Sequence, residues 1–164
     1  MSNSPIVKQY TNEYQAEVVN LILHIQQKEY NIPITKRDQP DLYTIEDFYQ
    51  TGKGNFWIAV YNNKVVGTIS LLDIGNNQVA LRKMFVDQEF RGAMFKTASL
   101  LLNKAIKWVE EKSIKTVYLG TTPQFLAAHR FYEKNGFTSI GVNELPENFP
   151  LLQVDRKFYQ YSLS

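Results

Sequence analysis

The sequence predicts an α+β fold in which an antiparallel meander of strands leads into a strand–helix–strand crossover. Two apolar runs, 56–61 and 64–72, flank Asn62-Asn63, and asparagine tolerates the positive φ of a tight hairpin turn. An amphipathic helix is predicted after Gly92, and a buried strand is predicted at 116–120. A crossover of this kind makes the two strands it joins parallel. We therefore expect a mixed, mostly antiparallel sheet of about six to seven strands flanked by about four α-helices, an α/β mixed sheet.

The length and composition are those of one folded unit. The chain has 164 residues, of which 44% are hydrophobic and 13% aromatic. This content predicts a globular protein with a two-layer core. No linker rich in glycine, serine or proline, no charge block and no internal repeat divides the sequence. We therefore predict a single domain over residues 1–164.

The N-terminal part is expected to hold one strand and two helices. Residues 5–9 have the composition of a short strand, and apolar residues recur at helical spacing from about Glu13 to Tyr30. Prolines at 33 and 40 interrupt regular structure, and Thr44 is suited to begin a short helix over 44–48.

Turn and capping residues mark the remaining elements. Gly75 and the two asparagines after it predict a second turn, before a strand over 79–86. Thr122 and Pro123 are suited to the N-cap and first position of a helix that ends at Gly136. Closing strands are expected over 137–140 and 156–163. The helix after Gly92, predicted at about five turns, has apolar residues at Ala98, Leu101, Leu102, Ala105, Ile106 and Val109.

Charge and composition exclude several functions. The net charge is +2, with 18 basic and 16 acidic residues, so nothing indicates a nucleic-acid partner. The chain has no cysteine, which excludes disulfides, thiolate nucleophiles and cysteine-based zinc sites, and its two histidines stand too far apart to predict a metal site. No apolar run is long enough to span a membrane, and the N-terminus lacks the layout of a signal peptide. A soluble, cytoplasmic protein without a membrane partner is expected.

The most informative segment is the strand, turn and helix from Leu81 to Gly92 and beyond. A turn that ends in Arg91-Gly92 leads from the strand into the helix. The first backbone N–H groups of a helix are unpaired and carry the positive end of its dipole, so this arrangement is suited to an anion such as a phosphate. An isolated Arg-Gly is weak support, because a solvated turn would look the same. A second segment, Ala127–Phe137, therefore decides the interpretation.

With both segments, the chain resembles the GNAT superfamily of N-acetyltransferases. The resemblance is close over about residues 55–140. It rests on the strand 81–86, the turn 87–92 and the motif Phe-Tyr-Glu-Lys-Asn-Gly-Phe at 131–137. It implies that acetyl-CoA is the cosubstrate and that no metal takes part. The implied pantetheine contacts are Met84, Phe85 and Val86. The implied pyrophosphate site is headed by Arg91 and includes the amides of Gly92, Ala93, Met94, Phe95, Lys96 and Thr97.

Three departures from the family pattern stand out. Met94 and Lys96 occupy positions where the family usually has small residues, mostly glycine, and a side chain there restricts the approach of a phosphate. Lys96 can compensate as a direct phosphate partner. Phe125 stands where many relatives have an asparagine that contacts the cofactor.

The resemblance implies that Tyr132 is the catalytic residue. A tyrosine at this position faces the cofactor sulfur in the family, and a protonated phenol can donate a proton as the thiolate leaves. The alternative is that Tyr132 packs its ring against the sheet, although Phe131 beside it can fill the core. The sequence does not identify a general base: strand 78–86 has no carboxylate, and the candidates are a water relay to backbone carbonyls or to Asp73. Both histidines, His24 and His129, are expected on helix surfaces.

The acceptor is expected to bind in the irregular segment 31–47 and the tail 144–159. Carboxylates with aromatic walls would suit a small cationic amine, whereas scattered core aromatics in a solvated loop are an equally good explanation. The run 145–150 is also compatible with a homodimer contact. The residues concerned are Asp38, Asp41, Glu46, Glu147, Tyr43, Phe48, Phe149 and Tyr159.

The sequence thus predicts an acyltransferase that moves an acetyl group from acetyl-CoA directly to a primary amine of a small molecule or peptide. Two alternatives stay open. One is a noncatalytic acyl-CoA-binding or regulatory module, in which the altered glycine positions reflect lost activity. The other is a transferase that uses a different acyl-CoA, such as succinyl-CoA.

Overall fold

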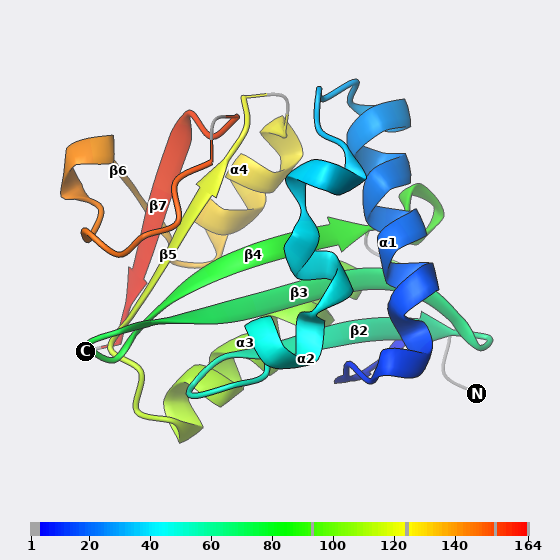
Figure 1. Cartoon of the computed structure of the whole chain (residues 1–164), viewed down its shortest axis with the longest axis horizontal. Coiled ribbons are helices and arrows are strands. Elements are labelled where there is room, and N and C mark those ends of the chain that lie inside the picture. The colour runs from blue at the N-terminus through cyan, green and yellow to red at the C-terminus, as the bar shows by residue number, and fades with distance from the viewer. Residues whose placement is uncertain (1–3, 93, 124, 153, 164) are drawn as a thin grey trace.

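The computed structural model describes residues 4–92, 94–123, 125–152 and 154–163. Seven strands form one sheet in the order β1-β2-β3-β4-β5-β7-β6 (Figure 1). All neighbouring pairs are antiparallel except β4 and β5, which are parallel. The predicted fold class, a mixed and mostly antiparallel sheet flanked by helices, is confirmed.

The element bounds are as follows. The strands are β1 (Ile6–Gln9), β2 (Asn55–Tyr61), β3 (Lys64–Gly75), β4 (Gln78–Val86), β5 (Thr116–Thr121), β6 (Thr138–Ile140) and β7 (Lys157–Ser162). The α-helices are α1 (Gln15–Leu23), α2 (Ile45–Phe48), α3 (Thr97–Glu111) and α4 (Leu126–Lys134). The short helical segments are η1 (Asn12–Tyr14), η2 (His24–Glu29), η3 (Lys36–Asp38), η4 (Pro40–Tyr43), η5 (Gln88–Phe90) and η6 (Val142–Glu144).

The helices cover both faces of the sheet and enclose two hydrophobic cores. On one face α1 and α2 pack on the central strands through residues such as Ile22, Ile45 and Ile58. On the other face α3 and α4 pack through residues such as Leu101 and Tyr132. Figure 1 shows α1 and α2 in front of the sheet and α3 and α4 behind it. Among the described residues, no helix is both long and apolar enough to cross a membrane.

The predicted turns have the backbone geometry that their residues suggested. Asn62 and Asn63 have φ of 50° and 63°, and Asn76 and Asn77 have φ of 56° and 59°. Positive φ at both central positions matches the right-handed twist of the flanking strands, which explains why asparagine is used at both hairpins. These turns connect β2 to β3 and β3 to β4.

Helix starts are where the structure differs from the sequence prediction. The α3 helix begins at Thr97 rather than directly after Gly92, because Lys96 has a φ of 51° that helical backbone does not allow. The α4 helix begins at Leu126 rather than Pro123, because the Phe125 N–H donates to the Thr122 carbonyl in a separate turn. The predicted N-terminal helix continues from α1 into a π-helical turn, η2. Gly136 ends α4 with a φ of 92°, as predicted.

A β-bulge interrupts β4 at the centre of the sheet. Thr68 pairs with Phe85 and Ser70 with Arg82, so one residue of β3 faces two residues of β4. Lys83 in the bulge has a φ of 56°. Its carbonyl accepts a hydrogen bond from Thr68 Oγ1 at 2.6 Å, which holds the bulge in place. A bulge shifts the alternation of side chains between the two faces of a strand.

Beyond the bulge, β4 and β5 separate. Their parallel pairing ends at Ala80 and Tyr118, whereas β5 continues to pair with β7 as far as Thr121. Figure 1 shows the two strands starting side by side and diverging. The backbone of β4 from Leu81 onward therefore has no strand partner on its β5 side. This gap in the sheet positions the candidate site.

Candidate acyl-CoA and acceptor site

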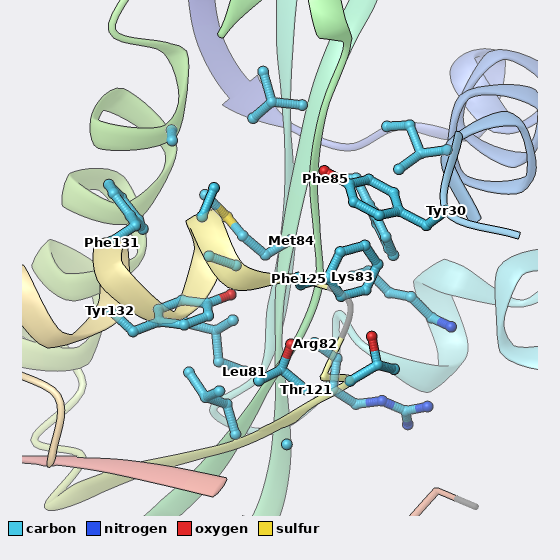
Figure 2. A pocket seen from close by; sticks show the side chains of 18 of the residues that line it. Tyr30, Leu81, Arg82, Lys83, Met84, Phe85, Thr121, Phe125, Phe131 and Tyr132 are labelled. Atoms are coloured by element: carbon cyan, nitrogen blue, oxygen red, sulfur yellow. The ribbon is translucent and has the colours of Figure 1, made fainter. Parts of the chain in front are cut away.

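A cavity of about 580 Å³ fills the space where β4 and β5 diverge. Its walls come from β4, β5, the start of α3, α4, the η2 turn and the segment before β7. Figure 2 looks into this cavity. The residues that line it include Gln26, Tyr30, Arg82, Lys83, Met84, Phe85, Val86, Arg91, Gly92, Lys96, Thr97, Thr121, Thr122, Phe125, Phe131, Tyr132, Phe149 and Asp155.

The N-terminus of α3 opens on one end of the cavity. Gly92 has a φ of 97°, a conformation that glycine adopts without strain. Lys96, Thr97 and the two residues after them line the cavity wall. The first amides of a helix lack intrahelical acceptors and carry partial positive charge. This end of the cavity is therefore suited to an anionic group.

Two buried hydroxyls support the presence of a ligand. Among the described residues, only Thr97 Oγ1 and Thr122 Oγ1 are buried polar side-chain atoms without a hydrogen-bond partner. Both residues line the same cavity. Buried hydroxyls are usually paired in folded proteins, so unpaired ones grouped at a cavity suggest that a ligand completes them. Together with the free edge of β4, they fit an extended ligand with amide groups and a phosphorylated end.

The matching sequence model is that of the "Acetyltransferase (GNAT) family", and it covers residues 19–137 of the chain. The chain belongs to the GNAT acetyltransferase family. The predicted resemblance is thus confirmed over most of the chain, including the strand, turn and helix from 81 to 97 and the segment that holds Tyr132.

Named relatives and solved structures agree with this family. N-acetylaspartate synthetase of Xenopus tropicalis is 38% identical over 108 residues, which are 63% of this chain and 38% of that protein. The human N-acetylaspartate synthetase is 34% identical over 125 residues, 73% of this chain and 40% of that protein. This chain thus spans well under half the length of these relatives.

Two solved structures show how widely the fold is shared. A GNAT-family acetyltransferase from Staphylococcus aureus Mu50 is 42% identical, with a TM-score of 0.94 over 98% of this chain and 100% of that chain. The PaiA N-acetyltransferase of Thermoplasma acidophilum, solved with coenzyme A, has a TM-score of 0.75 over 98% of this chain and 99% of that chain, at 16% identity. The latter likeness concerns the fold alone.

Most residues of the expected GNAT cofactor site line the cavity, but some do not. Those that do are Met84, Phe85, Val86, Arg91, Gly92, Lys96 and Thr97. Met94 is 76% exposed and its side chain does not line the cavity. The Phe95 ring packs against Phe90 at 4.8 Å instead of lining the cavity. Ala93 lies outside the described residues.

Arg91 is held in place by two sets of contacts. Its Nε donates to the Val86 carbonyl at 2.9 Å, which joins the turn to the end of β4. Its guanidinium forms a bidentate pair with the Glu29 carboxylate of η2, with the second nitrogen 2.9 Å from Oε2. The pair ties the N-terminal helical segment to the turn before α3. Arg91 is thus engaged within the protein and borders the cavity.

Tyr132 both packs in the core and reaches the cavity. Its ring is only 4% exposed and contacts the rings of Phe137 and Tyr159. Figure 2 shows its hydroxyl directed into the cavity beside Met84. Among the described residues, nothing hydrogen-bonds this hydroxyl. Burial raises the pKa of Tyr132 above its usual value, so the phenol is protonated at neutral pH. The ring therefore packs in the core, as the alternative interpretation held, and the catalytic role of the hydroxyl stays a prediction.

Phe125, one of the three predicted departures from the family pattern, contributes an aromatic ring to the cavity wall. Phe125 makes an edge contact with Tyr30 of the η2 end at 4.6 Å and another with Phe85 of β4 at 6.1 Å. The three rings lie together in Figure 2. They form an apolar wall between the N-terminal segment and α4.

Sequence reasoning missed a buried polar group at the bulge. The Lys83 ammonium lies 2.5 Å from Gln39 Oε1 and 3.6 Å from Asp41 Oδ2. Asp41 also accepts a hydrogen bond from the Tyr49 hydroxyl at 2.6 Å, and Gln39 is paired with Gln26. Burial lowers the pKa of Lys83 to about 8, although Asp41 opposes the shift. The positive φ that identifies the bulge has no sequence signal, because lysine is not a turn residue.

Sequence reasoning also missed Asp155, the carboxylate that lines the cavity. Asp155 is buried, and a methyl group on Gly120 would lie 2.6 Å from its Oδ2, so the carboxyl packs directly over the β5 backbone. Burial raises the pKa of Asp155 to about 6, against the opposing effects of Arg82, Lys83 and Arg156. A carboxyl with this pKa is largely ionised at neutral pH and can accept a proton.

The acidic residues expected around the acceptor lie elsewhere. None of Asp38, Asp41, Glu46 and Glu147 lines the cavity, nor do Tyr43, Phe48 and Tyr159, whereas Phe149 does.

Asp73 accepts hydrogen bonds from the Lys53 and Gly75 amides at the far end of β3, and His129 contacts the Thr122 carbonyl at 3.0 Å. His24 is exposed. The described part of the chain contains no group of three acidic or histidine side chains arranged for a metal ion.

Proposed function

We propose that the protein is an N-acetyltransferase that transfers the acetyl group of acetyl-CoA directly to a primary amine. The observation that carries the proposal is the cavity between the diverging strands β4 and β5, which joins an anion-suited helix start to a free tyrosine hydroxyl. Membership of the GNAT family supports the same chemistry.

The cosubstrate would lie along β4 with its phosphates at α3. The β4 edge at Met84 and Phe85, which has no strand partner on its β5 side, offers backbone groups to the amides of a pantetheine arm, and Val86 lines the cavity next to it. The α3 amides at Thr97 and beyond, with the Lys96 ammonium, offer donors to the pyrophosphate. Two GNAT proteins of this fold were solved with coenzyme A, one from Thermoplasma acidophilum and the N-acetylglutamate synthase of Neisseria gonorrhoeae, which supports acetyl-CoA as the cosubstrate.

Tyr132 would act as the acid. The amine forms a bond to the acetyl carbon, the carbon–sulfur bond breaks, and the thiolate needs a proton or a hydrogen-bond donor as it leaves. The Tyr132 hydroxyl is protonated, has no hydrogen-bond partner in the described part of the chain and is directed into the cavity. No cysteine is present to form an acetyl-enzyme, so direct transfer is the consistent route.

The amine is proposed to belong to a small molecule or a peptide that enters the same cavity. The curated relatives named N-acetylaspartate synthetase point to amino acids as the first acceptors to test. An apolar wall of aromatic rings and a volume of about 580 Å³ suit a small acceptor beside the acetyl end of the cosubstrate.

Two measurements on the purified chain test this function. Thermal shifts with acetyl-CoA, CoA and succinyl-CoA should show stabilisation by acetyl-CoA, because a ligand that binds only the folded state raises its stability. Thiol release over a panel of amines and amino acids should then show turnover with at least one acceptor. Stabilisation without turnover over the whole panel would favour a noncatalytic acyl-CoA-binding module. No stabilisation by any CoA compound would refute the proposal.

A further inference from the structure

The β4 bulge brings two cationic side chains to the same face of the sheet. Leu81, Met84 and Val86 belong to the core under α3 and α4, whereas Phe85 packs on the α1 and α2 side. Arg82 also lies on the latter side, with its guanidinium 5.8 Å from the Tyr49 ring centre. In regular alternation Lys83 would return to the α3 side, but the bulge leaves it beside Arg82 (Figure 2).

The two cations differ in how their charges are satisfied. The Lys83 ammonium forms an ion pair with the Asp41 carboxylate and donates a hydrogen bond to Gln39 Oε1. The Arg82 guanidinium lines the cavity and forms neither an ion pair nor a hydrogen bond with a described side chain, whereas the Arg82 carbonyl accepts a hydrogen bond from Ser70 Oγ. Its guanidinium lies 5.8 Å from the ring centres of Phe48 and Tyr49, and its charge also lowers the pKa of Asp155. A guanidinium in a cavity without a carboxylate partner is suited to bind one from a ligand, because its planar fork matches carboxylate geometry.

The cavity also holds the opposite charge. Asp155 lies over Gly120 of β5, across the gap from β4, and forms no ion pair with Arg82. The cavity wall therefore carries one cation and one carboxylate that form no ion pair with each other, with the Tyr132 hydroxyl opening into the same space. A zwitterion complements this arrangement: its carboxylate matches Arg82 and its ammonium matches Asp155.

We infer that the acceptor is an amino acid, with its carboxylate bound by Arg82 and its ammonium facing Asp155. This inference rests on the proposed function and names the acceptor class for it. The ammonium loses two protons during transfer. The first passes to the Asp155 carboxylate and then to water, which frees the nitrogen lone pair to bond to the acetyl carbon. The second is lost after the bond forms and replaces the proton that Tyr132 gives to sulfur, so one proton is released overall.

The test compares amino acids with their α-carboxamides, which keep the amine but lose the α-carboxylate. Suitable pairs are glycine, L-alanine, L-phenylalanine, L-aspartate and L-glutamate with the matching amides. The wild-type enzyme should prefer the acid in at least one pair. Arg82→Gln should raise KM for that acid about 10- to 100-fold, the usual loss for a charged hydrogen-bonded pair, and leave KM for the amide almost unchanged. Arg82→Lys should restore part of the preference.

Controls separate this inference from the proposed function. Lys64→Gln removes an exposed cation outside the cavity and should leave both KM values unchanged. Thermal shifts with acetyl-CoA should be the same for the wild-type chain and Arg82→Gln, which also shows that the variant folds. Turnover with simple amines or amides but no preference for acids would overturn the inference and leave the proposed function intact. Equal losses for acid and amide in Arg82→Gln would also overturn it.

Discussion

Lys83 and Asp41 form a buried ion pair whose members come from the central strand β4 and from the η4 turn, with Nζ 3.6 Å from Oδ2. Gln39 and Tyr49 complete the hydrogen bonds of the pair. The pair attaches the irregular segment after η2 to the β4 bulge. It therefore fixes the wall of the cavity on the side where we expect the acceptor.

Removal of both members of this pair should cost less free energy of unfolding than the sum of the two single removals. Asp41→Asn leaves the Lys83 ammonium buried without a counter-charge, and we expect a loss of about 3 kcal/mol in the free energy of unfolding at pH 7. Lys83→Met alone should also destabilise the protein, because it leaves the Asp41 carboxylate buried without a counter-charge. The double variant should lose less than the sum by at least about 1 kcal/mol. Urea unfolding of the four proteins measures this coupling, and additive losses would show that the pair is not energetically connected.

The buried Asp155 carboxyl should make stability depend on pH. Its pKa rises from 3.8 to about 6 in the folded chain because of burial, so the folded state holds this proton more tightly than the unfolded state does. The contribution of this group to stability is therefore present below pH 4 and is lost as the pH rises toward 6. Asp155→Asn cannot ionise, so its stability relative to the wild type should increase by about 2 kcal/mol between pH 4 and pH 7.5. Urea midpoints at the two pH values measure the effect, and a constant difference would contradict it.

Lys96 should affect folding and ligand binding in opposite directions. Its left-handed backbone conformation strains a residue with a side chain, so Lys96→Gly should stabilise the protein by about 1 kcal/mol. The same change removes a cation next to the proposed pyrophosphate site, so the Kd for acetyl-CoA should rise about 3- to 5-fold. Calorimetry and urea unfolding measure the two effects. Lys107→Gln, on the exposed surface of α3, is the matched control. A variant that binds acetyl-CoA more tightly would show that Lys96 hinders the phosphate.

Local patterns in the sequence were enough to predict the order of elements, the two hairpin turns and the parallel pair. Asn62-Asn63 and Gly136 correctly indicated positions with positive φ. The apolar spacing after Gly92 correctly indicated which face of α3 is buried. These features depend on neighbours within a few residues, so they can be derived from the sequence. The exact starts of α3 and α4 were not predicted, because Lys96 and the turn at Thr122 do not follow residue preferences.

The acceptor end of the cavity could not be predicted for a different reason. The β4 bulge arises because one residue of β3 lies opposite two residues of β4. No local sequence motif indicates this pairing. Asp155 reaches the cavity only because β7 pairs with β5, and Asp41 reaches Lys83 only through the fold of the segment before α2. These residues come together from segments far apart in the chain, so the charges that face the acceptor appear only in three dimensions.

The role of Tyr132 is tested most directly by the turnover of Tyr132→Phe. Its hydroxyl has no partner among the described residues, so the variant should fold and bind acetyl-CoA like the wild type. Tyr161→Phe, whose ring packs on Phe137 outside the cavity, is the matched control. With a saturating acceptor, kcat for Tyr132→Phe should fall about 100-fold or more, while the Kd for acetyl-CoA and the kcat of Tyr161→Phe stay near the wild-type values. An unchanged kcat for Tyr132→Phe would contradict the proposed mechanism.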